Sequence, residues 1–142
     1  MAGAVAQLSR RVDFAAAHRY RRPDWNEERN RSVFGACANL NYHGHDYACT
    51  VTVRGVIDDT TGMIIDLGLL DRILDDEIFA RFDHRNINLD VAEFADGRLV
   101  PTGENIARFI FERVQPRLPA GVELVRVDLA EDETLSATFG VR

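Results

Sequence analysis

Lysine is absent from this chain of 142 residues, in which arginine supplies all 17 basic side chains. Without lysine, a Schiff-base mechanism and a P-loop that holds phosphate through lysine are both excluded. No apolar run approaches the roughly 18 residues of a membrane-spanning helix. The first residues carry neither a basic leader nor a cleavage site, so we expect no signal peptide. Only two cysteines are present, which without a secretory signal is typical of a reducing, cytoplasmic compartment.

Positive charge is scarce relative to negative charge, because 23 acidic residues give a formal net charge of −6. This balance argues against nucleic acid or an anionic membrane as the main partner. Apolar residues make up 46% of the chain, which is enough to bury a core. The length suits one domain over residues 1–142.

Hydrophobic periodicity predicts an α+β fold with an antiparallel sheet. Period-two alternation indicates strands at 6–18, 45–56, 125–131 and 135–141, the last two joined as a hairpin by the turn 131–134. Two helices are expected to begin after the N-cap residues Asp66 and Thr102, the second ending before Pro116. The polar stretch 19–32 predicts a loop. Two strands, two helices and two strands, in that order, are typical of this fold class.

The histidines, only four in number, are concentrated in a few places. His43 and His45 alternate on an extended segment and so point to the same side, and His18 ends the face of the first strand. Three neutral imidazoles with an open fourth position are typical of a catalytic zinc site. The alternative is a turn with solvated histidines. A cupin-type metal site is disfavoured, because no glutamate stands four or five residues after His45.

The two cysteines differ in their surroundings. Cys37 lies six residues before His43, in a stretch that contains glycine and several asparagines. A thiol beside a cation loses its proton readily, so Cys37 is a candidate base or nucleophile; the alternative is a fourth ligand in a closed, structural zinc site. Cys49 alternates with Tyr47 and Val51 on one strand face, which predicts a small buried side chain.

Three further residues are candidates for acid/base chemistry or binding. Asp83 and His84 resemble a carboxylate that orients an imidazole, but adjacent residues on an extended backbone point apart. The alternative for this pair is a helix-end histidine beside a solvated acid. Glu131 continues an apolar strand face, where a carboxylate needs a partner such as the guanidine-like edge of a heterocycle. Its alternative is an exposed position in the hairpin.

Seven of the 17 arginines lie within one stretch of 22 residues. Such a cluster could hold a polyanionic small molecule, whereas the alternative for most of its members is a solvated loop. The seven are Arg10, Arg11, Arg19, Arg21, Arg22, Arg29 and Arg31.

Several strings, in their order and spacing, resemble the 6-pyruvoyl-tetrahydropterin synthase family, which includes the 6-carboxytetrahydropterin synthases of the queuosine route. They are FAAAH at 14–18, Cys37 followed by HGHDY at 43–47, TGMIIDL at 61–67, FDHRNIN at 82–88, PTGENIA at 101–107, and Glu131 eight residues before Phe139. Together these strings span nearly the whole chain.

The resemblance implies a tunnelling fold, with a four-stranded antiparallel sheet and two helices on one face. In this family, trimers close their sheets into a barrel and two trimers stack into a homohexamer. The resemblance also implies one zinc ion per chain and a small pterin triphosphate as substrate. A magnesium ion that accompanies the triphosphate is a further expectation.

Motif position also implies roles for individual residues. The expected zinc ligands are His18, His43 and His45. The expected catalytic residues are Cys37 as the proton-abstracting thiolate, with Asp83 and His84 reaching in from a neighbouring chain. The expected pterin-binding residues are Glu131, which would anchor the amino-pyrimidine edge, and Thr102 and Glu104 in the same pocket. The family's anchoring glutamate is usually followed by threonine, and here the pair Glu133-Thr134 makes Glu133 the alternative anchor.

The implied reaction is a step of tetrahydrobiopterin biosynthesis. A zinc-dependent lyase converts 7,8-dihydroneopterin triphosphate to 6-pyruvoyl-tetrahydropterin and eliminates triphosphate, without a redox cofactor. Five residues separate Cys37 from His43, as in the pyruvoyl-forming branch, whereas the carboxy-forming branch usually has three. Aldolase-like relatives carry glutamate where Leu40 stands.

Two other functions compete with this one. The first alternative is a 6-carboxy-5,6,7,8-tetrahydropterin synthase of queuosine biosynthesis. The second is a non-enzymatic, zinc-stabilised binding module with Cys37 as the fourth ligand, which would leave Asp83, His84 and Glu131 without a role.

Overall fold

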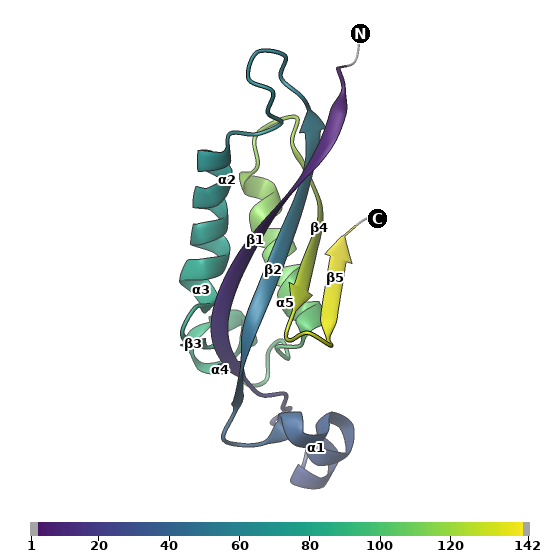
Figure 1. Cartoon of the computed structure of the whole chain (residues 1–142). Coiled ribbons are helices and arrows are strands. Elements are labelled where there is room, and N and C mark those ends of the chain that lie inside the picture. Colours follow the sequence, from purple (N-terminus) through teal and green to yellow (C-terminus); the bar gives the residue numbers. More distant parts are fainter. Residues whose placement is uncertain (1–2, 141–142) are drawn as a thin grey trace.

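A curved sheet of five strands with helices packed against one face makes up residues 3–140, the part of the chain that the computed structural model describes (Figure 1). The strands are β1 (Val5–His18), β2 (His43–Val56), β3 (Arg85–Asn86), β4 (Glu123–Ala130) and β5 (Ser136–Gly140). The α-helices are α1 (Glu27–Phe34), α2 (Leu67–Leu74), α3 (Ala80–Phe82), α4 (Ile87–Asp90) and α5 (Gly103–Val114). The 3₁₀ helices are η1 (Gly35–Ala38), η3 (Ala92–Phe94) and η4 (Gln115–Arg117), and η2 (Asp75–Phe79) is a π-helix.

The sheet is mixed rather than purely antiparallel. Its order is β3-β1-β2-β4-β5, and all neighbours are antiparallel except β1 and β3. The α+β class is confirmed, but the expected count of four strands is wrong for residues 3–140. The two-residue β3 adds a parallel edge beside Ala16 and Ala17, and a segment this short has no periodicity from which to predict it. Val141, expected in the last strand, lies outside the described residues.

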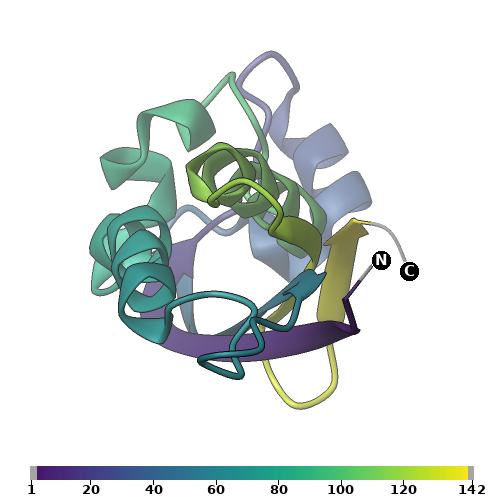
Figure 2. The ribbon, with the colours of Figure 1, turned by 90° about the horizontal axis from the view of Figure 1, so that it is seen from above.

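The face of β1 and β2 that the helices cover carries the core. Phe14 pairs with Tyr47 across the two strands, and their rings stack with centroids 4.9 Å apart. Seen from above in Figure 2, α2 and α5 lie on the same side of the sheet. Their apolar stripes, for example Ile73 of α2 and Ile110 of α5, are fully buried. This packing holds the strands in a fixed register, which ends with His18 opposite His43.

The caps that the sequence predicts are present. The Asp66 side chain accepts hydrogen bonds from the backbone of Gly68 and Leu69, so α2 begins at Leu67. The helical run then continues through η2 and α3 to Phe82. The Thr102 hydroxyl caps α5, which ends before Pro116 as expected.

The stretch 19–32 contains a helix that its polar composition did not predict. The Asn26 side chain accepts a hydrogen bond from the backbone N–H of Arg29, and α1 therefore begins at Glu27. Most α1 residues are exposed, so the helix has little apolar periodicity. Trp25 stacks on Phe34 with ring centroids 5.6 Å apart, which holds both ends of α1 together.

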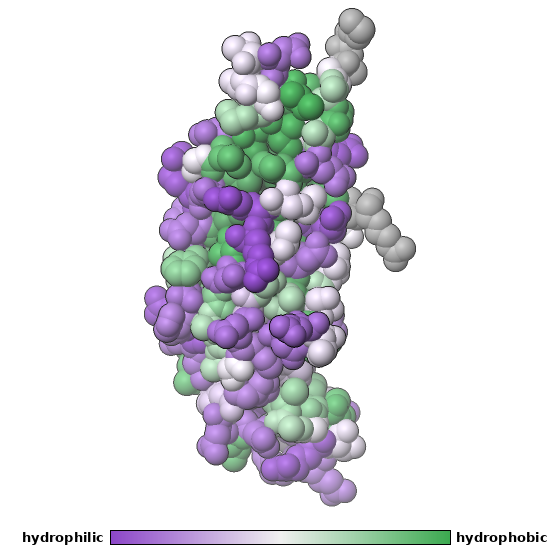
Figure 3. All heavy atoms as spheres, viewed as in Figure 1, coloured by the Kyte–Doolittle hydropathy of each residue, from purple (hydrophilic) through white to green (hydrophobic). Residues whose placement is uncertain are grey.

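Among the residues that the structure describes, none forms a helix on the opposite face of the sheet (Figures 1 and 2). Figure 3 views this face and shows hydrophilic residues over much of it, with apolar residues gathered near its upper end. Side chains on it pair with one another, as in the Arg11–Asp13 ion pair and the Ser9–Thr52 hydrogen bond. Within residues 3–140, no helix has the length and apolar character needed to cross a membrane.

Candidate metal centre

Three histidines converge where β1 ends and β2 begins. His18 lies directly across from His43, and His45 follows two residues along β2 on the same face. The ring centroids lie 4.6 Å apart for His18 and His43, 5.1 Å for His18 and His45, and 5.0 Å for His43 and His45. Each ring offers one nitrogen, and these three atoms lie within 4.8 Å of one another. The alternative of a solvated turn is wrong, because His43 and His45 both belong to β2.

The buried ring of His18 is oriented by a backbone carbonyl. Its Nδ1 lies 2.9 Å from the carbonyl oxygen of Pro101, which can only accept, so Nδ1 carries the proton and Nε2 keeps its lone pair. The Tyr47 hydroxyl lies 3.0 Å from the same Nδ1. Burial, with a smaller contribution from His43, lowers the pKa of His18 to about 4. The ring is therefore neutral at pH 7, as a metal ligand must be.

His45 contributes a buried nitrogen whose bonding capacity is unused. Among the described residues its Nε2 has no hydrogen-bond partner, and Glu131 Oε2 lies 3.9 Å away, beyond hydrogen-bond distance. A buried polar atom without a partner is costly, and a metal ion shared by the three rings would satisfy it. Burial and the neighbouring His45 lower the pKa of His43 as well. Three converging imidazole nitrogens are a donor set that suits zinc with an open coordination position.

Cys37 lies on η1, in the loop that leads from β1 to β2. Its thiol is not a member of the ligand group, so it does not complete a closed four-ligand site among the described residues. Its carbonyl accepts a 2.7 Å hydrogen bond from the backbone N–H of Tyr20. Burial, and then the Glu131 carboxylate, raise the pKa of the Cys37 thiol. By contrast Cys49 is fully buried in the core, as expected, and burial raises its pKa to about 12.

Glu131 is buried beside this centre rather than exposed in the hairpin. Its Oε1 accepts a 2.9 Å hydrogen bond from the Tyr20 hydroxyl. Glu133, the alternative anchor, is exposed. Its burial and its proximity to the histidines therefore favour Glu131 over Glu133 as the pterin-anchoring residue.

Three residues that contact the predicted site are not expected from the sequence. They are Tyr20, Tyr47 and Pro101. Tyr47 could have been predicted to lie beside the site, because it follows His43 and His45 at the same spacing of two residues along the strand. Nothing in the sequence marks the carbonyl of Pro101, since a backbone group is independent of residue type.

Asp83 and His84 are in contact, contrary to the expectation for an extended backbone. His84 has φ +57°, and this left-handed conformation brings its Nδ1 to 2.7 Å from Asp83 Oδ2. Asp83 Oδ1 accepts a hydrogen bond from the backbone N–H of Ala15, and the N–H of His84 donates to the Ala15 carbonyl. The bond from Ala15, and then the bond to His84, lower the pKa of Asp83. The pair is therefore fixed to β1.

The His84 side chain is 84% exposed, unlike the buried His18. It lines a groove of about 500 Å³ with Ala15, Gly44 and Asp46, whose positions alternate with those of the metal-binding histidines. The pair thus lies at the open side of the sheet and is accessible to another molecule.

Thr102 and Glu104 both lie at the start of α5. The Thr102 hydroxyl accepts a 3.1 Å hydrogen bond from the backbone N–H of Asn105, so its evident task is to cap the helix. Glu104 is exposed in the first turn. Burial and then Glu131 raise the pKa of Tyr20, and the charge of Glu104 makes a smaller contribution. A Cβ atom on Gly103, which lies between them, would stand 3.7 Å from Glu131 Oε1. Both residues are therefore near the buried carboxylate, and their contact with substrate stays a prediction.

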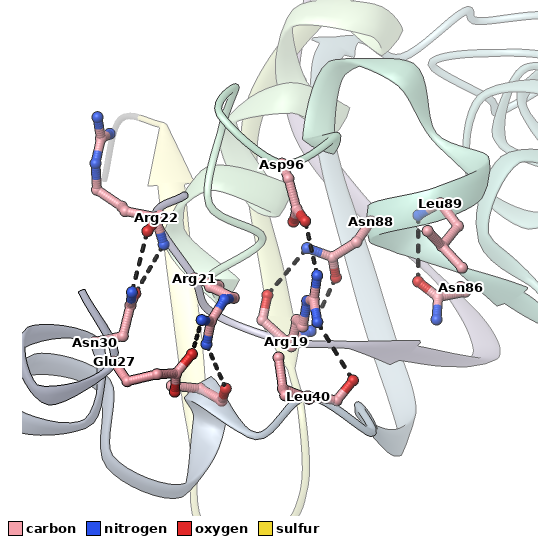
Figure 4. Close-up of polar contacts among 11 residues, drawn as sticks. Arg19, Arg21, Arg22, Glu27, Asn30, Leu40, Asn86, Asn88, Leu89 and Asp96 are labelled. Carbon is pink, nitrogen blue, oxygen red and sulfur yellow. Dashed lines mark hydrogen bonds and ion pairs between the residues drawn. The ribbon is translucent and has the colours of Figure 1, made fainter. Parts of the chain in front are cut away.

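The N-terminal arginines are largely engaged within the chain. Figure 4 shows Arg19 donating to Asp96 and to the carbonyl of Leu40, while the Asn88 amide bonds the backbone of Arg19 in both directions. Five of the seven form ion pairs: Arg10 with Asp71, Arg11 with Asp13, Arg19 with Asp96, Arg21 with Glu27, and Arg22 with Asp24. These contacts favour structural roles on β1 and in the loop that carries Cys37 over a polyanion site.

Comparison with known proteins places these features in one context. Residues 7–141 match the family model described as 6-pyruvoyl tetrahydropterin synthase. A 6-pyruvoyl tetrahydrobiopterin synthase from Pongo abelii is 43% identical over 128 residues, which cover 90% of this chain and 86% of the relative. The solved structure of the Caenorhabditis elegans 6-pyruvoyl tetrahydropterin synthase superposes with a TM-score of 0.90 at 31% identity, covering 100% of this chain and 99% of the other. A 6-carboxy-5,6,7,8-tetrahydropterin synthase from Bacillus subtilis is 31% identical over 90 residues, which cover 62% of this chain and 57% of the relative.

Proposed function

The chain belongs to the 6-pyruvoyl tetrahydropterin synthase family, and from this premise we propose that it uses zinc bound by His18, His43 and His45 to convert 7,8-dihydroneopterin triphosphate to 6-pyruvoyl-tetrahydropterin. It is accordingly a lyase that eliminates triphosphate. Its reaction is a step of tetrahydrobiopterin biosynthesis. The observation that carries the site assignment is the group of three converging imidazoles with the unpartnered Nε2 of His45. When bound there, zinc supplies positive charge that stabilises developing oxygen anions of the substrate and a nearby thiolate.

Cys37 is the proposed base that removes a carbon-bound proton from the substrate side chain. Its place outside the ligand group leaves its sulfur free for that task. Burial and Glu131 raise the pKa of the thiol, so a nearby positive charge is required before it acts as a base at neutral pH. Proton shifts within the substrate then reduce the ring while triphosphate leaves, and no external electron donor is needed.

Glu131 is the proposed anchor for the pterin ring. Its buried carboxylate has acceptor positions beyond the one that Tyr20 fills. The amino-pyrimidine edge of a pterin presents two N–H donors side by side, which suit a carboxylate. Thr102 and Glu104 are proposed to line the same pocket.

Asp83 and His84 are the proposed proton-transfer pair. The bond to Asp83 fixes the proton on Nδ1 of His84, so Nε2 is free to exchange a proton with substrate. The exposure of His84 supports action on the site of a neighbouring chain. We therefore propose the family's assembly, a homohexamer of two trimers in which the sheets close into a barrel.

The proposed location is the cytoplasm. Two free cysteines support it, because thiols stay reduced there. A magnesium ion is proposed to accompany the substrate triphosphate, because phosphate oxygens are among its preferred ligands. The proposed binding partner is the substrate, a small pterin triphosphate.

One product analysis tests the function. The zinc-loaded protein is incubated with 7,8-dihydroneopterin triphosphate, and the pterin product is identified by mass spectrometry. We expect the three-carbon pyruvoyl side chain. Two observations support this expectation: five residues separate Cys37 from His43, and the relative named as a pyruvoyl-forming enzyme aligns with 90% of this chain. A one-carbon carboxy side chain would assign the chain to the queuosine branch, and unchanged substrate would contradict the enzyme assignment.

A further inference from the structure

Tyr20 lies beside both the three-histidine centre and the buried carboxylate of Glu131, whose Oε2 is 3.9 Å from His45 Nε2. Its ring lies edge-on to His18, with centroids 5.0 Å apart, and also faces His43 at 6.5 Å. Phe34 packs edge-on against the ring at 6.0 Å. The ring is therefore held between the adjoining ends of β1 and β2 and the C-terminal end of α1, so the position of its hydroxyl is well defined.

The hydroxyl of Tyr20 makes a hydrogen bond that orients Glu131. It lies 2.9 Å from Oε1, and because a carboxylate can only accept, Tyr20 is the donor. Among the described residues, this is the one hydrogen bond to the Glu131 carboxylate. The bond is charge-assisted, in a place where Glu131 is only 5% exposed.

The backbone of Glu131 is fixed as well. Its N–H donates to the carbonyl of Leu135, and the Asp132 side chain accepts from the N–H groups of Thr134 and Leu135. The turn therefore fixes the backbone position of Glu131, and Tyr20 fixes the position of its carboxylate.

We propose that Tyr20 is a positioning residue that fixes the orientation of the Glu131 carboxylate and its distance from the three-histidine centre. This inference rests on the proposed function, in which Glu131 binds the pterin ring and the metal acts on the substrate side chain. The phenol packs against His18 and donates to the carboxylate, so it sets the position of the carboxylate relative to the histidines. It acts through Glu131 and does not itself take part in the chemistry.

Tyr20→Phe tests the inference, because it removes the hydroxyl and keeps the packed ring. Losing a hydrogen bond to a buried charged group is expected to weaken pterin binding about tenfold or more. Binding is measured by the fluorescence of neopterin, which has the same amino-pyrimidine edge and lacks the triphosphate. The same factor is expected in KM, with kcat nearly unchanged, because the anchor binds ground state and transition state alike. Zinc content should stay at one ion per chain.

Two controls make the result specific. Tyr42→Phe removes the hydroxyl of a half-buried tyrosine on the same loop and is expected to bind neopterin as the wild type does. A double variant, Tyr20→Phe with Glu131→Gln, is expected to bind no more weakly than Glu131→Gln alone, because the two residues act through one interaction. Tyr20→Leu also lacks the hydroxyl and serves if Tyr20→Phe does not fold.

The outcomes separate this inference from the proposed function. Wild-type affinity in Tyr20→Phe, loss of zinc in that variant, or additive effects in the double variant would overturn the role of Tyr20 while leaving the enzyme assignment intact. Failure of the wild type itself to bind neopterin or turn over the triphosphate would contradict the proposed function. Weaker binding with retained zinc and no further loss in the double variant would support the inference.

Discussion

The two faces of the sheet hold histidines in opposite environments. On the helix-covered face, His18 is fully buried, and burial lowers its pKa to about 4. On the open face, His84 is 84% exposed and bonded to the carboxylate of Asp83. A buried, neutral imidazole suits a metal ion, whereas an exposed imidazole beside a carboxylate is accessible for proton transfer with a substrate. The same side chain thus acquires two tasks from its surroundings.

The largest expected effect concerns the buried group. Replacing His18, His43 or His45 by alanine is expected to remove zinc and to lower activity by about 1000-fold or more, since several kcal/mol of charge stabilisation is lost. Metal content is measured by atomic emission and activity by triphosphate release. His84→Ala is the matched control, because it should keep zinc while losing turnover. Full zinc occupancy in all three single variants would contradict the ligand assignment.

The exposed pair provides the next test. His84→Ala is expected to lower kcat about 100- to 10,000-fold, the usual contribution of a general acid or base. If the pair serves a neighbouring chain, mixing inactive His84→Ala with inactive Cys37→Ala after dissociation should restore part of the activity. Asp83→Asn should resemble His84→Ala, because it removes the acceptor that fixes the imidazole. No recovery in verified mixed oligomers would place the complete site within one chain.

A smaller effect is expected from the titration of His18 in metal-free protein. Its pKa is about 6.5 in the unfolded chain and about 4 in the folded one, so the folded state resists protonation. The associated stability is present above pH 6.5 and is lost as pH falls toward 4, amounting to about 3 kcal/mol. Urea unfolding of the metal-free protein between pH 7 and pH 4 measures it. A His18→Gln variant with an equally steep pH dependence would show that another group is responsible.

The smallest expected effect separates capping from substrate binding at Thr102. Thr102→Ala is expected to lower the free energy of unfolding by about 1 kcal/mol, because α5 loses its N-cap. Thr102→Ser, which can still accept from Asn105, should restore that stability. The proposed contact with the pterin predicts in addition a higher KM for Thr102→Ala. An unchanged KM would limit Thr102 to its structural role.

Much of this fold follows from sequence periodicity. Alternation located the four antiparallel strands, and Asp66 and Thr102 located the two main helices, because strand pleating and N-capping are local rules. The two-residue β3 and the polar α1 escaped prediction, since both depend on tertiary contacts rather than on an apolar pattern. Tertiary packing also determines how the strands curve into a sheet, which alternation along single strands does not indicate.

The site divides in the same way. The same-side geometry of His43 and His45 follows from a period of two, and the structure confirms it. The contact between Asp83 and His84 could not be predicted, because it depends on a left-handed backbone at His84. The bond between Tyr20 and Glu131 joins residues 111 positions apart, which no local pattern can indicate.

The most direct test of the central claim is the zinc content and turnover of Cys37→Ala. The claim is that three histidines hold the metal while Cys37, outside the ligand group, acts as the base. Cys37→Ala is therefore expected to keep one zinc per chain and an unchanged melting temperature, and to lose triphosphate release by about 100-fold or more. Cys37→Ser should be nearly as inactive, because a hydroxyl is far harder to deprotonate than a thiol. Loss of zinc together with a lower melting temperature would make Cys37 a structural ligand and contradict the account.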